Sequence, residues 1–327
     1  YIEEVKVVIL LLTLNPSILR TSIIEGVELN TINNITDYKV EFNDGLIYAA
    51  KTIKTLQGET VMLGFLGGPG GRFMKNYLVK NKIKSDFTWL DKDIKTIHKI
   101  LDSINGTETI MKNHGINVDN KLVRFLFQKY QNHLANISTV VFSGEIPNGL
   151  TENELKKIIS LAKEKHKKVI INLENNIYVK MLECGITSVA ILNKDSLSLM
   201  NIDIKDKEDM LKKCYQLLLD YRLKYMMIDL DEEGIYTLTK NKICFAHYPE
   251  HVDEVKLTGL KDTLVGSFAL GLDRQYEQER LTKLVAAVGL AYRSKSEICR
   301  KDIDYYHKRV KVLEIMSKSK GFIKISQ

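Results

Sequence analysis

Short apolar runs and amphipathic segments alternate along most of the chain. Two runs, residues 7–14 and 61–66, are continuously apolar, which is typical of strands buried on both faces. Further strand-like runs cover residues 139–143, 168–173, 188–192, 224–230 and 235–239, the last two forming a hairpin. Helical spacing predicts helices over residues 49–56, 73–81, 121–134, 151–166, 179–184, 206–222, 281–294 and 302–316. This alternation predicts a mostly parallel, three-layer α/β domain.

Two insertions, residues 17–42 and 86–118, interrupt the alternation with strand-like sequence. We expect them to form one small β-sheet that stands off the main domain as a lid. The main domain would then comprise residues 1–16, 43–85 and 119–317, followed by a tail over residues 318–327. A ligand is expected at the carboxyl ends of the parallel strands, between the main sheet and the lid.

The composition is that of a globular protein. The chain has 327 residues, of which 44% are hydrophobic and 27% charged, enough for a large core. Its net charge of +7 is spread over many lysines without interleaved aromatic residues, so we expect no nucleic-acid partner. The apolar run 7–14 is too short to cross a bilayer and lacks a signal-peptide pattern, so no membrane association is expected. Four cysteines without CxxC or zinc spacing indicate buried thiols and a cytoplasmic location.

Residues 255–272 combine a turn glycine with a helix start. Gly259 precedes Asp262 and Thr263, and a small, apolar helix follows. Unpaired backbone N–H groups at such a helix start form an anion site, which the helix dipole strengthens. A carboxylate there can also accept a proton from a nucleophile. Taken alone, however, this pattern more often marks an ordinary turn and helix cap.

Five segments occur in the order known from one family. They are Thr13-Leu14-Asn15-Pro16, L-G-F-L-G-G at residues 63–68, Ser143-Gly144 with Pro147 and Gly149-Leu150, Asn193, and Asp262 with Gly266 or Ser267 and Phe268. They resemble the opening strand, the second strand and turn, the S-G-x-x-P-x-G-L segment, the K-P-N asparagine and the G-A-G-D-S signature of the ribokinase-like (PfkB) carbohydrate kinases. The branch that holds 1-phosphofructokinase and tagatose-6-phosphate kinase is the most similar. Each match alone is weak, but five in the same order are specific.

The resemblance implies a three-layer α/β/α sandwich with a β lid that uses ATP and Mg²⁺ to phosphorylate a hydroxyl of a sugar or sugar phosphate. Asp262 would be the general base, and Gly259, Leu260 and Lys261 would form the anion hole. The other implied site residues are Asn15, Gly45, Lys95 and Ser143 for the substrate, Asn193, Asp229, Asp231 and Gly234 for the nucleotide, and Asp195 for the metal. Because family lids often pair, the resemblance also implies a homodimer through the lid, with Trp89 at the contact.

Several positions depart from the family pattern. Leu19 stands where the family has a substrate-binding aspartate, and Lys95 stands where it has a phosphate-contacting arginine. The glutamate of the N-x-x-E magnesium motif is missing, unless Asp195 serves instead. Lys261 replaces the second glycine of G-A-G-D. Its ammonium could neutralise phosphate, or its side chain could fill the space that the backbone needs to approach phosphate.

The nucleotide segment departs most. The family's S-x-G-x-x-G reads D-L-D-E-E-G at residues 229–234, which places up to four carboxylates near the ATP phosphates and opposes phosphate binding. The alternative to a working kinase is therefore a degenerate, catalytically weak or inactive kinase-fold protein with a binding or regulatory role. The orientation of Lys261 and of residues 231–233 distinguishes the two hypotheses.

Overall fold

The structure is a computed structural model that describes residues 8–43, 45–248, 258–295, 297–317 and 321–322. Some predicted features lie outside the described residues. They are Val7 of the first predicted strand, residues 255–257 before the Gly259 turn, and most of the predicted tail.

Eleven of the described strands form one large sheet in the order β15-β14-β13-β12-β11-β10-β9-β8-β1-β4-β5. Its parallel part consists of β5 (Lys84–Leu90), β4 (Glu59–Gly67), β1 (Val8–Thr13), β8 (Ile137–Gly144), β9 (Lys168–Leu173), β10 (Val189–Asn193) and β11 (Tyr225–Asp229). Its antiparallel part consists of β12 (Gly234–Leu238), β13 (Lys242–His247), β14 (Lys311–Ser317) and β15 (Gly321–Phe322). The predicted mostly parallel α/β fold is confirmed, and so is the hairpin of β11 and β12.

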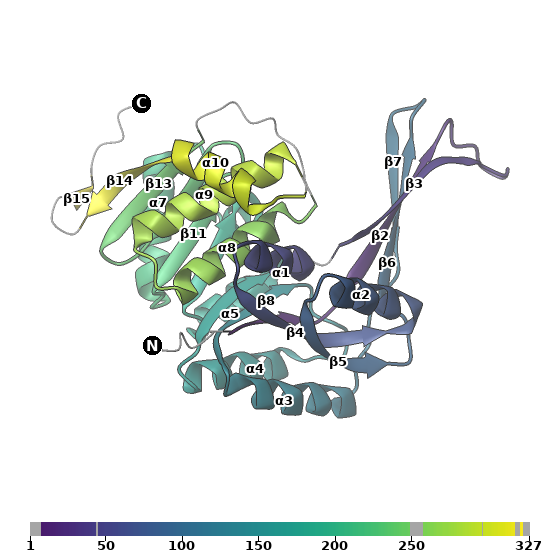
Figure 1. The fold of residues 1–327 in the computed structure, drawn as a ribbon, viewed down its shortest axis with the longest axis horizontal. Coiled ribbons are helices and arrows are strands. Elements are labelled where there is room, and N and C mark those ends of the chain that lie inside the picture. Colours follow the sequence, from purple (N-terminus) through teal and green to yellow (C-terminus); the bar gives the residue numbers. More distant parts are fainter. Residues whose placement is uncertain (1–7, 44, 249–257, 296, 318–320, 323–327) are drawn as a thin grey trace.

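Helices cover both faces of this sheet (Figure 1). One layer contains α1 (Gly45–Thr55), α2 (Gly68–Lys80), α8 (Leu260–Asp273), α9 (Gln278–Ser294) and α10 (Arg300–Arg309). The other contains α3 (Asn120–Leu134), α4 (Glu152–Glu164), α5 (Asn175–Glu183), α6 (Lys194–Leu199) and α7 (Lys207–Asp220). The two layers follow from right-handed crossovers, because the chain moves along the sheet in opposite directions before β5 and after β8.

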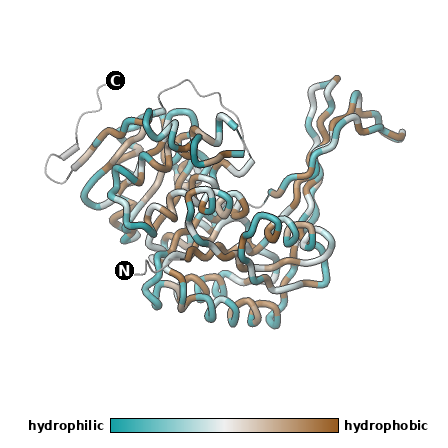
Figure 2. Tube along the Cα trace, viewed as in Figure 1, coloured by the Kyte–Doolittle hydropathy of each residue, from teal (hydrophilic) through white to brown (hydrophobic). Residues whose placement is uncertain are grey.

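The apolar runs form the core between the layers, where the central strands are the most hydrophobic segments (Figure 2). All residues of β1 except Val8 are buried, and β4 is buried from Thr60 onward. The predicted capping box is present at the start of α4, where Thr151 and Glu154 cap each other.

A second sheet, the lid, has the strand order β3-β2-β6-β7 and projects from the main body beside α2 (Figure 1). Its strands are β2 (Ser17–Ile24), β3 (Ile35–Phe42), β6 (Lys95–Asp102) and β7 (Thr107–Lys112). The boundary of the second insertion needs correction, because β5 pairs in parallel with β4 and belongs to the large sheet. Trp89 therefore lies on β5 near Gly71 of α2, not in the lid.

The C-terminal region corrects a second prediction. The helix expected over residues 302–316 ends at Arg309, and residues 311–317 form β14 against β13. Residues 310–316 are rich in β-branched and other apolar side chains, which favour a strand and explain why the helix ends before them.

Two further expectations concern the cysteines and the membrane. Cys214 and Cys244 are buried thiols as predicted, but Cys184 and Cys299 are exposed. No helix in the described part of the chain is long and apolar enough to cross a membrane.

Candidate active site

The predicted base lies at the start of α8. Gly259 precedes this helix with a φ of 83°, a left-handed conformation that favours glycine. The Thr263 N–H donates to the Gly259 carbonyl at 2.9 Å, so the N–H groups before it point out of the helix start. A Cβ at Gly259 would overlap the ring of Tyr48, so this position also lacks space for any side chain. The backbone therefore has, beside Asp262, the geometry that the predicted anion site requires.

Asp262 is held by groups from three other elements. The Ser143 hydroxyl, near the end of β8, donates to Asp262 Oδ1 at 2.8 Å, and Asn172 Nδ2 of β9 donates to Ser143 Oγ at 3.1 Å. Gly45, the first residue of α1, lies so close that a Cβ there would overlap the carboxylate. The carboxylate thus lies at the N-terminal ends of both α8 and α1, where helix dipoles stabilise a negative charge. Asn172 was not predicted from the sequence, although its place near the end of a parallel strand was a usable signal.

A buried ion pair lies on the lid side of this carboxylate. Lys95 Nζ, at the start of β6, contacts Glu145 Oε2 at 2.5 Å and Oε1 at 2.7 Å. Asn15 Nδ2, after β1, donates to Glu145 Oε2 at 3.1 Å, and the Ile116 N–H donates to Asn15 Oδ1 at 3.3 Å. The structure thus brings the predicted residues Lys95 and Asn15 together around a carboxylate that sequence reasoning missed. The signal was a charged residue directly after Ser143-Gly144.

Glu174 follows β9 and was also missed. Its pKa is raised, first by desolvation and then by the negative charges of Glu145 and Asp262, while Lys95 and Lys261 oppose the shift. Because these charges come from the residue after β8, from β6 and from α8, Glu174 lies near the Lys95–Glu145 pair and Asp262.

Two lysines pair with the acidic turn after β11. Lys194 Nζ lies 3.4 Å from Asp231 Oδ2 and 3.0 Å from Glu232 Oε1, and Lys207 Nζ lies 2.7 Å from Glu233 Oε2. Burial acts to raise the pKa of Glu232, but its backbone hydrogen bond and Lys194 outweigh burial and lower it. Two ammonium groups thus offset part of the negative charge that, from the sequence, opposes ATP binding.

The turn also keeps the backbone shape of a glycine-containing loop. Asp231 has a φ of 57°, and Gly234 has a φ of 129° with no space for a Cβ beside the Ala246 carbonyl. Asp231, where the family has glycine, thus adopts the left-handed conformation that aspartate tolerates better than most residues.

Asp229 is the buried member of the turn, with 2% exposure. Burial, followed by the charge of Asp231, raises its pKa to about 7, and Arg293 and Lys261 act in the opposite direction. Its Oδ1 accepts the Asp231 N–H at 3.0 Å, while its Oδ2 has no hydrogen-bond partner among the described residues.

Lys261 reaches toward the first turn of α6. Its ammonium lies 3.0 Å from Asp195 Oδ2, and both side chains are largely exposed. Asn193 caps α6 by accepting the Ser196 N–H at 2.9 Å, while Ser196 Oγ accepts the Asn193 N–H at 2.7 Å. Ser196 therefore completes a capping box at the position where the family has its glutamate. No cluster of three or more metal-ligating side chains occurs in the described ranges.

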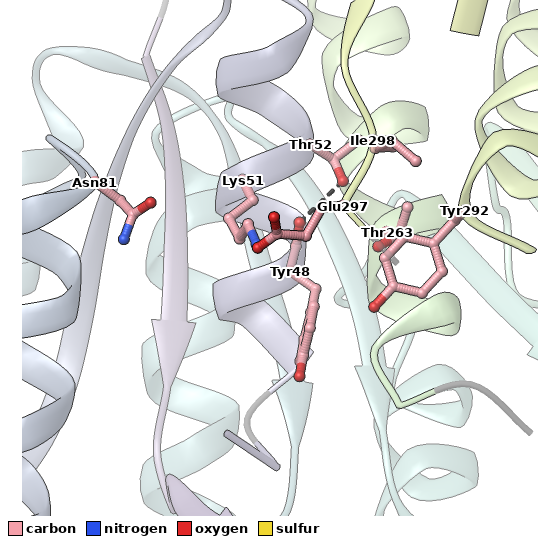
Figure 3. A pocket seen from close by; sticks show the side chains of 8 residues that line it. All are labelled: Tyr48, Lys51, Thr52, Asn81, Thr263, Tyr292, Glu297 and Ile298. Carbon is pink, nitrogen blue, oxygen red and sulfur yellow. Dashed lines mark hydrogen bonds and ion pairs between the residues drawn. The ribbon is translucent and has the colours of Figure 1, made fainter. Parts of the chain in front are cut away.

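A cavity of about 250 Å³ lies near this site but contains none of the predicted site residues. Figure 3 shows that it is bounded by α1, α8 and the connection from α9 to α10, with Tyr48 and Tyr292 on its wall. The two rings meet edge to face at 6.3 Å. Thr263, directly after Asp262, lines this cavity as well. The Tyr48 ring therefore lies between this cavity and the Gly259 turn, and packs against the turn.

Comparisons with known proteins find similar sequences and a similar fold. The chain is 23% identical over 314 residues to tagatose-6-phosphate kinase of Staphylococcus epidermidis, covering 94% of this chain and 99% of the relative. It is 23% identical over 288 residues to 1-phosphofructokinase of Borreliella burgdorferi, covering 88% and 92%. Escherichia coli phosphofructokinase-2, solved in complex with fructose-6-phosphate, superposes with a TM-score of 0.78 at 19% identity, covering 93% and 99%.

The family model described as pfkB family carbohydrate kinase matches residues 49–301, which include most of the helices and strands described above. The matched range holds Ser143 and Asn193 at the carboxyl ends of β8 and β10, Lys95 at the start of β6, and Asp262 in the first turn of α8. This chain belongs to the pfkB family of carbohydrate kinases.

Proposed function

We propose that this protein transfers the terminal phosphoryl group of ATP to a hydroxyl of a sugar or sugar phosphate, with Asp262 as general base. The observation that carries the proposal is the position of Asp262, which accepts the Ser143 hydroxyl at the convergence of two helix starts. This position orients the carboxylate, as a proton acceptor requires, and places it where the helix dipoles favour negative charge.

The chemistry follows from what the site residues can do. Asp262 accepts the proton of the acceptor hydroxyl as that oxygen attacks the phosphoryl group. The N–H groups of Gly259, Leu260 and Lys261 bind the oxygens of the transferring group, whose charge develops in the transition state. Ser143 and Asn172 hold the base in place, and Asn15 and Gly45 shape the acceptor side. The lid excludes water that would compete with the acceptor.

The nucleotide is proposed to bind along the start of α6 and the turn after β11, beside Asn193, Asp229, Asp231 and Gly234. Lys194 and Lys207 support this placement because they offset part of the charge of the acidic turn. Lys261 is proposed to turn from Asp195 to the phosphates when ATP binds, since its exposed ammonium is held by a single surface ion pair.

The residues near the proposed phosphate site can hold Mg²⁺ with a single carboxylate, that of Asp195. Mg²⁺ is usually held by one or two carboxylates together with substrate phosphates and water, so a site without a three-residue cluster can still take it. Asp195 would hold it through water, and the ion would neutralise phosphate charge.

The acidic turn is one of several departures from the family pattern that suggest the degenerate-kinase alternative, together with Leu19, Lys95, Lys261 and the missing magnesium glutamate. Lysines pair with Asp231, Glu232 and Glu233, and the raised pKa of Asp229 reduces its charge near neutral pH. The acidic turn is therefore a weaker reason for expecting an inactive protein.

The lid is proposed to form a homodimer contact. Its strands β3 and β7 expose Ile35, Tyr38, Val40, Ile110 and Met111, with exposures between 37% and 56%. Apolar side chains on a projecting sheet favour pairing with a second copy. Sedimentation should give a dimer, and a monomeric mass at micromolar concentration would contradict it. We also propose a cytoplasmic location, since all four cysteines, each within the described residues, are free thiols.

The central experiment measures ADP formation with a panel of sugars and sugar phosphates for wild type, Asp262→Asn and the distant control Asp86→Asn. Asp262→Asn should bind ATP normally in calorimetry yet lose about 10²-fold or more in kcat, because its amide cannot accept the proton. Asp86 pairs with Lys129 and His133 at the edge of the large sheet, so Asp86→Asn should retain activity. Equal activity of Asp262→Asn and wild type would refute the assignment of the base.

A further inference from the structure

The Lys95–Glu145 pair occupies the acceptor side of the site. Lys95 is only 6% exposed, and both carboxylate oxygens of Glu145 contact its ammonium, at 2.5 and 2.7 Å. The charge of a buried lysine that contacts both oxygens of a carboxylate is already compensated within the protein. An incoming anion could use Lys95 only by displacing Glu145.

The position of Glu145 is fixed from a second side. Asn15 donates to the same Oε2 that contacts Lys95, and the Ile116 N–H fixes the Asn15 side chain in turn. Displacing Glu145 would therefore break several hydrogen bonds at once. It would also leave a carboxylate beside the incoming anion, where like charges repel strongly in a partly buried site.

The other charged groups near this pair also disfavour an anionic acceptor. Glu174 and Asp262 add carboxyl groups close to it, and Glu145 and Asp262 both raise the pKa of Glu174. On the lid, the two pairs that follow Ser17–Lys95 are Ile18–Thr96 and Leu19–Ile97, and neither adds a charge. Lys112 lies opposite Ile97 on β7 but is exposed, so solvent screens its charge.

We infer that the acceptor is a neutral, hydroxyl-rich molecule such as a free sugar, and that Glu145 excludes a phosphorylated acceptor by occupying Lys95. The inference rests on the proposed function and narrows its acceptor from "sugar or sugar phosphate" to the unphosphorylated class. Hydroxyl groups can donate to the remaining lone pairs of Glu145, which is 34% exposed, and of Glu174, whereas a phosphate dianion finds carboxylates there. The preference would differ from the substrate in the name of the relative, tagatose-6-phosphate kinase.

The test compares matched acceptor pairs, D-tagatose with tagatose 6-phosphate and D-fructose with fructose 6-phosphate. Calorimetry on Asp262→Asn gives affinities without turnover, and ADP formation by wild type gives kcat/KM. We expect each free sugar to be preferred over its phosphate by about tenfold or more, the size of one lost charge interaction. Equal or tighter binding of the phosphates would overturn the inference.

Glu145→Gln tests the assigned residue. It keeps the side-chain shape but frees the charge of Lys95, so the preference should shift toward the phosphorylated member by about tenfold. Asp86→Asn makes the same change in net charge away from the site and should leave the preference unchanged. An unchanged preference in Glu145→Gln would overturn the role of Glu145.

Inorganic phosphate provides a probe that does not depend on the choice of sugar. Phosphate at about 10 mM should raise the melting temperature of Glu145→Gln more than that of wild type. The gain should vanish in the double variant Lys95→Met/Glu145→Gln, which separates Lys95 from the anion hole at Gly259. A gain of equal size in wild type, or one that survives the loss of Lys95, would overturn the inference.

These readouts separate the inference from the proposed function. Absent turnover with every acceptor, together with a binding preference for free sugars, would refute the kinase proposal and leave the inference standing. Turnover with sugar phosphates at higher kcat/KM would support the kinase proposal and refute the inference.

Discussion

Ser143 and Asp262 are 119 residues apart in the sequence, yet the Ser143 hydroxyl donates to the Asp262 carboxylate at 2.8 Å. This hydrogen bond joins the end of a central strand to the start of the helix that carries the base. It fixes one carboxylate oxygen, so that the orientation of the second is set before the acceptor binds.

Ser143→Ala should therefore reduce kcat by about tenfold to a hundredfold, since a hydrogen bond to a charged group contributes about 1.5–3 kcal/mol. ATP affinity should not change. The measurement is steady-state kinetics, with Ser267→Ala as control, because the Ser267 hydroxyl donates to the Leu264 carbonyl within α8 itself. An equal loss in both variants would indicate a general packing effect instead.

Gly259→Ala tests the turn that builds the anion hole. An alanine would meet both the left-handed φ of 83° and the Tyr48 ring, so we expect a loss of about 2 kcal/mol or more in unfolding free energy. Gly185→Ala is a matched control, because Gly185 has a φ of 62° but open space around it, and should cost about 1 kcal/mol. Urea unfolding of both variants measures the difference, and equal losses would contradict a steric role for Tyr48.

The sequence predicts those site residues whose positions follow from local pattern, and it does not predict pairs that form through tertiary contacts. Gly259, Asp262 and Ser143 lie at strand ends and helix starts, which apolar periodicity and motif order locate. The partnership of Lys95 with Glu145 joins residues 50 positions apart and depends on how the lid sits over β8, which periodicity does not encode. The lysines that pair with residues 231–233 come from α6 and α7. The sequence alone therefore overestimates the negative charge that ATP would meet at this turn.

The buried Asp229 predicts a pH dependence of stability. Burial raises its pKa from 3.8 to about 7, so the folded protein retains a proton that the unfolded chain releases in this range. The resulting stabilisation is complete below about pH 4 and is lost as the pH rises through about 7. Asp229→Asn stays neutral, so its stability relative to wild type should increase on the order of 2 kcal/mol between about pH 5 and pH 8. Urea unfolding at both pH values checks this, and a difference that does not change with pH would show that Asp229 is ionised in the fold.

Lys194 should control nucleotide affinity. Lys194→Met leaves Asp231 and Glu232 without their ammonium partner, so the KM for ATP should rise about tenfold with little change in kcat. Lys212→Met removes a comparable charge from the exposed pair with Glu208 on α7 and serves as control. If both variants have the same KM, the acidic turn does not face the ATP phosphates.

Variants of Lys261 and Asp195 test whether Lys261 acts on the transferring phosphoryl group or only orients Asp195. If the ammonium neutralises the transferring phosphoryl group, Lys261→Met should lower kcat by about 10²-fold. Asp195→Asn should then retain most of the activity, because it merely releases Lys261 from an exposed ion pair at 3.0 Å. If Lys261 instead only orients Asp195, both single variants should lose the same activity, and the double variant should be no worse than either. Measuring kcat for the three variants over a range of Mg²⁺ concentrations decides the question, since only a role for Asp195 in holding the ion makes Asp195→Asn require more Mg²⁺.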